Sequence, residues 1–230
     1  MKQLRRSNER GQADHGWLKS LHSFSFANYY DPNFMGFRDL RVINQDVIAG
    51  GGGFPTHGHS DMEILTYVLS GALRHKDSEG NSEVIRPGEI QKMSAGTGIH
   101  HSEFNESSTE PCELLQIWLS PDKRGVKPSY DQKKIDWSTP GLKLIASPDS
   151  VGSDHAVHLE QDAKVFACQQ KDVSHYQALP GRYYWIQVIE GQIEVLGEVL
   201  SAGDAMAYYE DSGREMAFKG SCHFLLFDLN

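Results

Sequence analysis

Short runs of β-forming residues, separated at close intervals by turn residues, dominate this chain. Gly, Pro, Asn and Asp divide runs rich in Val, Ile, Leu, Tyr and Phe, and helical periodicity is scarce. This punctuation predicts an all-β sandwich or barrel. The number of runs suits two β-barrels, and the candidate strands are 40–43, 63–69, 72–75, 83–85, 90–94, 100–105, 114–119, 142–146, 183–189, 192–195, 205–209 and 223–227.

A weak internal repeat divides the 230 residues into two halves. A strand that ends at Gly71 and a later Gly88-Glu89 turn in the first half correspond to Gly191 and Gly203-Asp204 in the second half. The polar stretch 121–140 is the best candidate for the connection between them. We therefore predict an N-terminal domain over residues 1–125 and a C-terminal domain over residues 126–230.

Charge and cysteine content exclude several classes of protein. Acidic residues outnumber basic ones by 31 to 22, and the sequence has no basic block that could follow a phosphate backbone, so direct nucleic-acid binding is disfavoured. No apolar run reaches membrane-spanning length, and polar residues 7–10 follow the basic start where a signal peptide would be apolar. Cys112, Cys168 and Cys222 lie in strand-like segments, which is typical of buried, reduced thiols. We expect a soluble cytoplasmic protein.

Two pairs of ligand-type residues share the spacing that a β-strand requires. His57 and His59 form one pair, and His101 and Glu103 form the other. Because strand side chains alternate between faces, both members of a pair leave the same face, roughly 6.5–7 Å apart at their bases. Two such pairs on facing strands would enclose one metal ion. Three imidazoles and one carboxylate suit a first-row divalent ion with open coordination positions, as in non-heme Fe(II) oxygenases.

The same alternation separates His101 from its neighbour His100. If Glu103 and Asn105 face the site, His101 faces it too and His100 turns outward. The second half of the chain has no such pairs. Its scattered histidines are expected to have structural or surface roles, and they are His155, His158, His175 and His223.

Longer motifs around the two pairs resemble those of the cupin superfamily. Residues 51–63 fit the first cupin motif, Gly-x5-His-x-His-x3-Glu. Residues 88–105 resemble the second motif, although Ser94 stands where proline is common and two extra residues precede His101. Together with residues 8–11, 14–17 and 24–32, these motifs make the chain resemble the pirin family from end to end. That resemblance implies a bicupin whose amino-terminal jelly-roll barrel holds a metal and whose carboxy-terminal barrel has lost its ligands.

For individual residues, the pirin resemblance implies that His57, His59, His101 and Glu103 are the metal ligands. Glu63 corresponds to a residue that is a ligand in many other cupins. Here it is expected to lie beside the metal ligands or in the pocket, and the alternative is that it only makes hydrogen bonds near the barrel mouth. Fe(II) is the expected metal, and Zn, Ni, Mn, Co or Cu suit the same donors. The chain is expected to be a monomer of two barrels.

Bacterial pirins are similar to quercetinases, so the resemblance also implies a reaction. A dioxygenase of this kind opens the central ring of a flavonol such as quercetin with O₂ and releases carbon monoxide, and Glu103 is the candidate catalytic base. Phe54, Met62, Phe104 and residues 24–30 are candidates for flat pocket walls or for core packing. The glycines at 50–53 indicate either a close backbone approach or a loop over the mouth.

The family also implies an alternative function. Eukaryotic pirins are described as metal-dependent or redox-responsive transcriptional co-regulators that act through protein partners. The two functions differ in access to the metal. An enzyme needs a cavity wide enough for a three-ring phenol, whereas a sensor can keep its metal site narrow.

Overall fold

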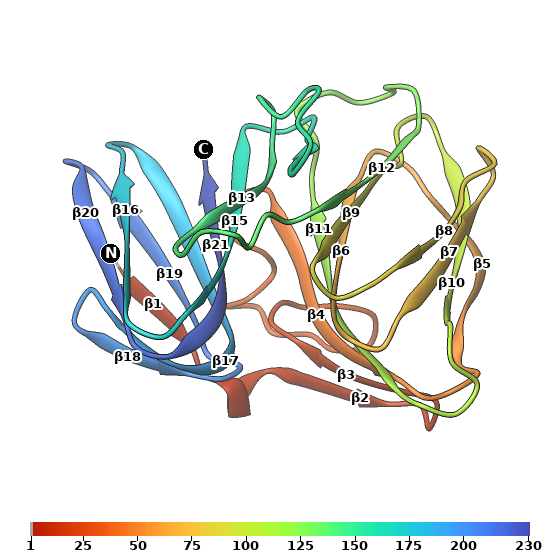
Figure 1. Cartoon of the computed structure of the whole chain (residues 1–230), viewed down its shortest axis with the longest axis horizontal. Helices are drawn as coiled ribbons and strands as arrows, with labels where there is room; N and C mark the ends of the chain where they lie inside the picture. The colour runs from red at the N-terminus through yellow and green to blue at the C-terminus, as the bar shows by residue number, and fades with distance from the viewer. Residues whose placement is uncertain (1) are drawn as a thin grey trace. The chain divides into compact units, whose positions relative to one another are not determined.

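The structure, a computed structural model, describes residues 2–230 and consists almost entirely of β-strands (Figure 1). It forms two compact units, each built from separate segments of the chain. The N-terminal barrel contains Gly11–Ile135 and Asp149–Gln161, and the C-terminal barrel contains the chain up to Arg10, Asp136–Pro148 and Asp162–Asn230. The predicted all-β class and the two barrels are confirmed, while the division at residues 125 and 126 stays a prediction.

Two antiparallel sheets form the N-terminal barrel, seen in orange, yellow and green in Figure 1. The seven-stranded sheet has the order β12-β9-β6-β11-β4-β3-β2, with β2 (Gly11–Asp14), β3 (Leu18–His22), β4 (Leu40–Ile48), β6 (Glu63–Ser70), β9 (Glu89–Ser94), β11 (Cys112–Leu119) and β12 (Ser129–Lys134). The four-stranded sheet has the order β5-β10-β7-β8, with β5 (Gly53–His59), β7 (Leu73–Asp77), β8 (Ser82–Ile85) and β10 (Ile99–Asn105). The short strand β14 (Val157–His158) lies in the segment Asp149–Gln161.

Alternating side chains hold these two sheets together. Leu73 and Ile85 of the four-stranded sheet pack with Ile48, Val68 and other buried residues of the seven-stranded sheet in one apolar cluster. Full burial of each such side chain contributes roughly 1.5–3 kcal/mol to folding. The rigid packing between the sheets fixes where β5 and β10 present their polar side chains.

The C-terminal barrel has an apolar interior. Its elements are β1 (Lys2–Arg5), the 3₁₀ turn η1 (Ser7–Glu9), β13 (Lys143–Ser147), β15 (Ala163–Gln170), β16 (Val173–Ala178), β17 (Arg182–Val195), β18 (Glu198–Ser201), β19 (Ala205–Glu210), β20 (Arg214–Lys219) and β21 (Cys222–Leu229). Strand β1, red in Figure 1, pairs antiparallel with β19. Tyr184, Phe218 and Phe224 belong to the large buried cluster of this barrel. No helix within residues 2–230 is long and apolar enough to cross a membrane.

Candidate metal centre

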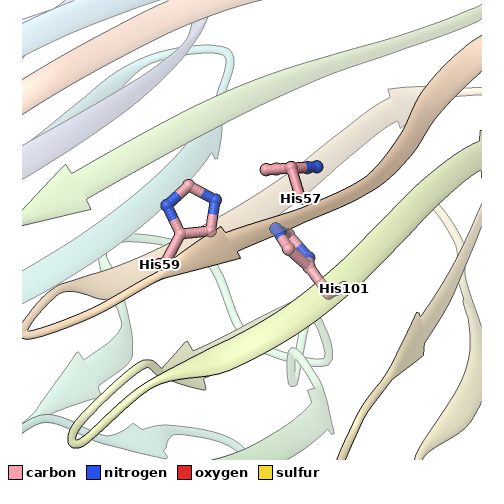
Figure 2. Close-up of side chains that lie close together, drawn as sticks. All are labelled: His57, His59 and His101. Carbon is pink, nitrogen blue, oxygen red and sulfur yellow. The ribbon is translucent and has the colours of Figure 1, made fainter.

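Three histidines converge where β5 and β10 pair. His57 lies directly opposite His101 in the antiparallel register, and His59 lies one alternation further along β5. The ring centroids of His57 and His101 are 4.4 Å apart, and His59 lies 4.8 Å from His57 and 5.0 Å from His101. Figure 2 shows the three imidazoles pointing toward one another from the two strands. One ligand atom from each lies within 4.8 Å of the others, so the group could hold a metal ion.

Strand alternation sorts the adjacent histidines of β10 as the sequence predicted. The His101 side chain is 2% exposed, whereas His100 is exposed to solvent. Both ring nitrogens of His101 lack a hydrogen-bond partner among residues 2–230. Because buried polar nitrogens are normally paired, this orphaned imidazole fits a metal ion as its missing partner.

The other two histidines are also arranged as neutral ligands. The Nδ1–H of His57 donates to the carbonyl oxygen of Pro55 at 2.9 Å, which leaves Nε2 as the lone-pair nitrogen. Burial lowers the pKa of His59 to about 4, and burial together with the neighbouring histidines lowers the pKa of His101 to about 2. The imidazoles of His59 and His101 are therefore unprotonated at neutral pH, and the unprotonated imidazole is the form that binds metals.

Glu103 lies beside this cluster, deep in the barrel. Its carboxyl group is buried, and its Oε1 accepts a hydrogen bond from Thr66 Oγ1 at 3.5 Å. Burial, followed by the charge of Asp46, raises the pKa of Glu103 to about 7. Its carboxylate oxygen lies within 4.8 Å of ligand nitrogens of His101 and His75, in a second group that shares His101 with the first. The structure thus brings the three predicted histidines into one group and places Glu103 in the adjoining one.

His75, which no sequence motif indicated, lies on β7 and belongs to the second group with His101 and Glu103. It is fully buried, its ring centroid is 5.3 Å from that of His101, and its Nε2–H donates to Asp77 at 3.1 Å. The Nδ1 atom has no partner among residues 2–230. The alternation His75-x-Asp77 on a strand next to β10 was the signal that could have identified it.

Glu63 does not belong to the centre, so its expected place beside the metal or in the pocket is wrong. It precedes Thr66 by three residues on β6, and an odd separation puts the two side chains on opposite faces of a strand. Thr66 faces Glu103, whereas Glu63 accepts a hydrogen bond from the backbone N–H of Glu160 at 3.3 Å and lies near Lys92. Its role is to bind the segment 149–161 to the outer face of the sheet.

A cavity of about 730 Å³ opens beside the three histidines. His57, His59 and Glu103 line it, and its aromatic walls come from Trp17, Phe26, Tyr29, Phe54 and Trp118. Trp118 contacts His59 edge to face at a centroid distance of 4.9 Å, and Phe26 contacts Trp118 in the same way at 5.4 Å.

Two of the predicted pocket walls lie elsewhere. Phe104 turns outward on β10 and is 41% exposed, and Met62 packs against the buried cluster of Ile64 and Met93. Phe54 and part of the segment 24–30 do line the cavity. The prediction for Phe104 failed because the alternation that buries Glu103 points the next residue to solvent.

The glycine run before β5 permits a close backbone approach. A Cβ atom added to Gly53 would lie 2.5 Å from the carbonyl oxygen of Glu103, a distance that no real side chain tolerates. Between the two open interpretations of residues 50–53, the structure favours close approach at this position. Gly53 therefore sets the spacing between the two strands that carry the histidines.

The remaining histidines have ordinary partners. His155 Nδ1 bonds the carbonyl oxygen of Lys134 at 3.1 Å, and exposed ion pairs join His158 to Glu160 and His175 to Glu215. His223 is buried, and burial lowers its pKa to about 4. Within residues 2–230 the groups that could hold a metal ion all lie in the N-terminal barrel.

Two family models match the two parts of the chain. The Pirin family model matches residues 3–119, and the model of the quercetinase C-terminal cupin domain matches residues 144–229. A quercetin 2,3-dioxygenase of Escherichia coli (strain K12) is 49% identical over 226 residues, 98% of this chain and 97% of that protein. A pirin-like protein of Caulobacter vibrioides is 40% identical over 205 residues, 88% of each chain.

A solved structure matches the whole chain. The crystal structure of the bacterial pirin YhhW from Escherichia coli in complex with nickel(II) is 48% identical, with a TM-score of 0.93, and covers 100% of this chain and 99% of that chain. Both barrels are therefore cupin domains, and the chain is a bicupin that belongs to the pirin family.

Proposed function

We propose that the N-terminal barrel is a metal-dependent dioxygenase site that opens quercetin-like flavonols with O₂ and releases carbon monoxide. The observation that carries this proposal is the convergence of three imidazoles on a large aromatic-walled cavity. A volume of about 730 Å³ lies within the range of small-molecule sites. The names of the quercetin 2,3-dioxygenase relatives support the same reaction.

His57, His59 and His101 would hold the metal, and Glu103, whose carboxylate lies beside His101, would be the fourth ligand. Fe(II) is our first choice for this donor set, and Ni(II), Zn(II), Mn(II), Co(II) or Cu(II) suit the same ligands. When bound, the metal supplies positive charge that favours a deprotonated flavonol and a path for electrons to O₂. Three neutral imidazoles and one carboxylate would compensate one of the two positive charges and leave a net charge near +1.

Glu103 would accept the proton of the flavonol 3-hydroxyl. In the metal-free protein, burial raises the pKa of this carboxyl group to about 7, so it takes up a proton readily near neutral pH. The hydroxyl of Thr66 holds Oε1, so one carboxylate oxygen keeps a fixed position while the other is available to the substrate. Burial keeps competing water away from the transferred proton.

The aromatic walls would orient a planar substrate. Trp118 and Phe26 meet at an interplanar angle of 86°, and Trp17 and Phe54 meet at 79°, so each pair presents both a ring face and a ring edge. Edge-to-face and offset contacts with aromatic ligands each contribute about 0.5–1.5 kcal/mol beyond burial. The flat rings of a flavonol would fit between these walls with the 3-hydroxyl directed at Glu103.

The width of the cavity ranks this activity above the alternative, a redox sensor or transcriptional co-regulator acting through protein partners. A sensor has no use for a three-ring pocket beside its metal. The three free, buried cysteines accord with the cytoplasmic location that we propose for the reaction.

Carbon monoxide release from aerobic quercetin tests the activity. Protein reconstituted with Fe(II) or Ni(II) is compared with a His59→Ala variant treated in the same way. We expect metal-dependent carbon monoxide from the wild type and none above background from the variant. If wild-type protein holding one metal ion per chain releases no more carbon monoxide than the variant, the quercetinase assignment is wrong and the sensor hypothesis takes its place.

A further inference from the structure

A band of polar side chains crosses the inner face of the seven-stranded sheet. His22, Asn44, Gln116 and Thr66 stand directly opposite one another on β3, β4, β11 and β6. The inner face of a barrel is normally apolar, as it is elsewhere in this one. Burying four polar side chains in register has a cost that a ligand with polar groups would offset.

Members of the band bond to one another and lead to the candidate base. His22 Nδ1 contacts Asn44 Oδ1 at 2.8 Å, and Thr66 Oγ1 lies 3.3 Å from Gln116 Oε1 and 3.5 Å from Glu103 Oε1. These contacts fix the orientation of the side chains that line one wall of the cavity. Aromatic side chains adjoin these polar ones, because Trp118 follows Gln116 by two residues on β11 and Phe26 contacts His22.

Asp46 is the exception, because half of its carboxylate is unpaired. It follows Asn44 on the inner face of β4, lines the cavity and is only 4% exposed. Its side chain takes a hydrogen bond from Ser20, whereas no donor among residues 2–230 reaches Oδ1. A buried carboxylate oxygen without a donor is costly, so the cavity favours a ligand that brings an O–H group to this point.

We propose that Asp46 is the specificity-determining residue of the cavity, accepting a hydrogen bond from a second hydroxyl group of a planar polyphenol whose first hydroxyl faces Glu103. This inference rests on the proposed function and narrows it. The site selects polyhydroxylated aromatic substrates over those with a single hydroxyl group.

Binding to redox-inert protein tests this role without turnover. Zn(II)-loaded protein is titrated under nitrogen with three flavonols, quercetin, galangin and 3-hydroxyflavone, and with catechol and phenol. Binding is followed by the quenching of tryptophan fluorescence, since Trp17 and Trp118 line the cavity. Asp46→Leu removes the acceptor, and Asp46→Asn keeps the shape and a neutral acceptor. Glu113→Gln is the control. Glu113 precedes Leu114, the residue that pairs with Asp46, and its carboxylate accepts a hydrogen bond from Gln45 away from the cavity.

We expect the wild type to bind quercetin about 10- to 100-fold more tightly than 3-hydroxyflavone, the effect of one hydrogen bond to a charged group. Asp46→Leu should lose that preference while its affinity for 3-hydroxyflavone stays within about twofold, and Asp46→Asn should fall between. Glu113→Gln should match the wild type.

Three results would overturn the inference: a preference that survives in Asp46→Leu, an equal loss for both ligands in the folded Asp46→Asn protein, or no preference for catechol or quercetin in the wild type. Failure of the proposed function looks different. In that case Fe(II) and Ni(II) protein releases no carbon monoxide, yet the preference for extra hydroxyls and its dependence on Asp46 persist.

Discussion

Replacing Gly53 by alanine should damage the metal centre without changing any ligand side chain. The added Cβ would lie 2.5 Å from the carbonyl oxygen of Glu103, about 1 Å closer than ordinary van der Waals contact, which begins near 3.4 Å. The Phe104 ring, 2.4 Å from the added Cβ, can turn aside, but the carbonyl oxygen is backbone, so β5 and β10 must separate by a comparable distance. We expect a loss of about 1–3 kcal/mol in the free energy of unfolding, the usual cost of overpacking.

The same displacement moves His57 away from His101, its partner in the register. Metal sites tolerate only a few tenths of an ångström in ligand distance, and a misplacement of 1 Å costs about 100-fold in rate. We therefore expect weaker metal binding in a chelator competition and about 100-fold slower carbon monoxide release. Gly58→Ala is the matched control on β5, because its Cβ would meet only the exposed His100 side chain at 3.2 Å. Equal stability, metal affinity and turnover in the two variants would refute the reasoning.

Four further predictions concern buried titratable side chains of the N-terminal barrel. Glu103→Gln should slow carbon monoxide release at least about 100-fold. The two proteins are compared at equal metal content, which is measured by mass spectrometry. Burial raises the pKa of Glu103 from 4.5 to about 7, so the metal-free protein has stability at acidic pH that it loses as the pH rises through 7. Between pH 5 and pH 8, the free energy of unfolding in urea should fall less for the Glu103→Gln variant than for the wild type, by up to about 3 kcal/mol. Equal decreases in the two proteins would contradict the burial argument. His75→Phe should weaken Zn(II) binding about 10- to 100-fold in a competition titration, because it keeps a ring behind His101 but removes the imidazole nitrogens and the bond to Asp77; unchanged affinity would assign His75 to packing alone. Glu63→Gln should lower the free energy of unfolding by about 1–3 kcal/mol and leave metal content and turnover unchanged, whereas a loss of metal would return Glu63 to the site.

Strand alternation made the histidine cluster predictable from the sequence. Alternation depends only on residues two apart in the sequence. His57 and His59 could therefore be assigned to one face of their strand, and His101 and Glu103 to one face of theirs, before the strands were known to pair. The same rule, applied to Glu63 and Thr66, would have placed Glu63 on the outer face. Its position in the cupin motif led to the opposite expectation, because a motif records spacing along the chain and not the face that a side chain occupies.

Features that depend on distant segments could not be predicted. Strand β1 is short and polar, and it forms because Leu4 lies opposite Met206, 202 residues later in the sequence. Strand β3 lacks an apolar inner face because Ser20 and His22 line the cavity, so its sequence carries no clear strand signal. The buried position of Asp46 becomes visible only when β3 and β11 pair on either side of β4.

The position of the metal ion is the most direct test of the proposed centre. We would crystallise the Ni(II)-loaded protein and locate the ion by anomalous diffraction. We expect one ion bound by the imidazole nitrogens of His57, His59 and His101, at about 2.0–2.1 Å as for other divalent ions, with a carboxylate oxygen of Glu103. An ion bound instead by His75, His101 and Glu103 would contradict the proposed ligand set. So would the absence of an ion at this position in protein shown to contain stoichiometric nickel.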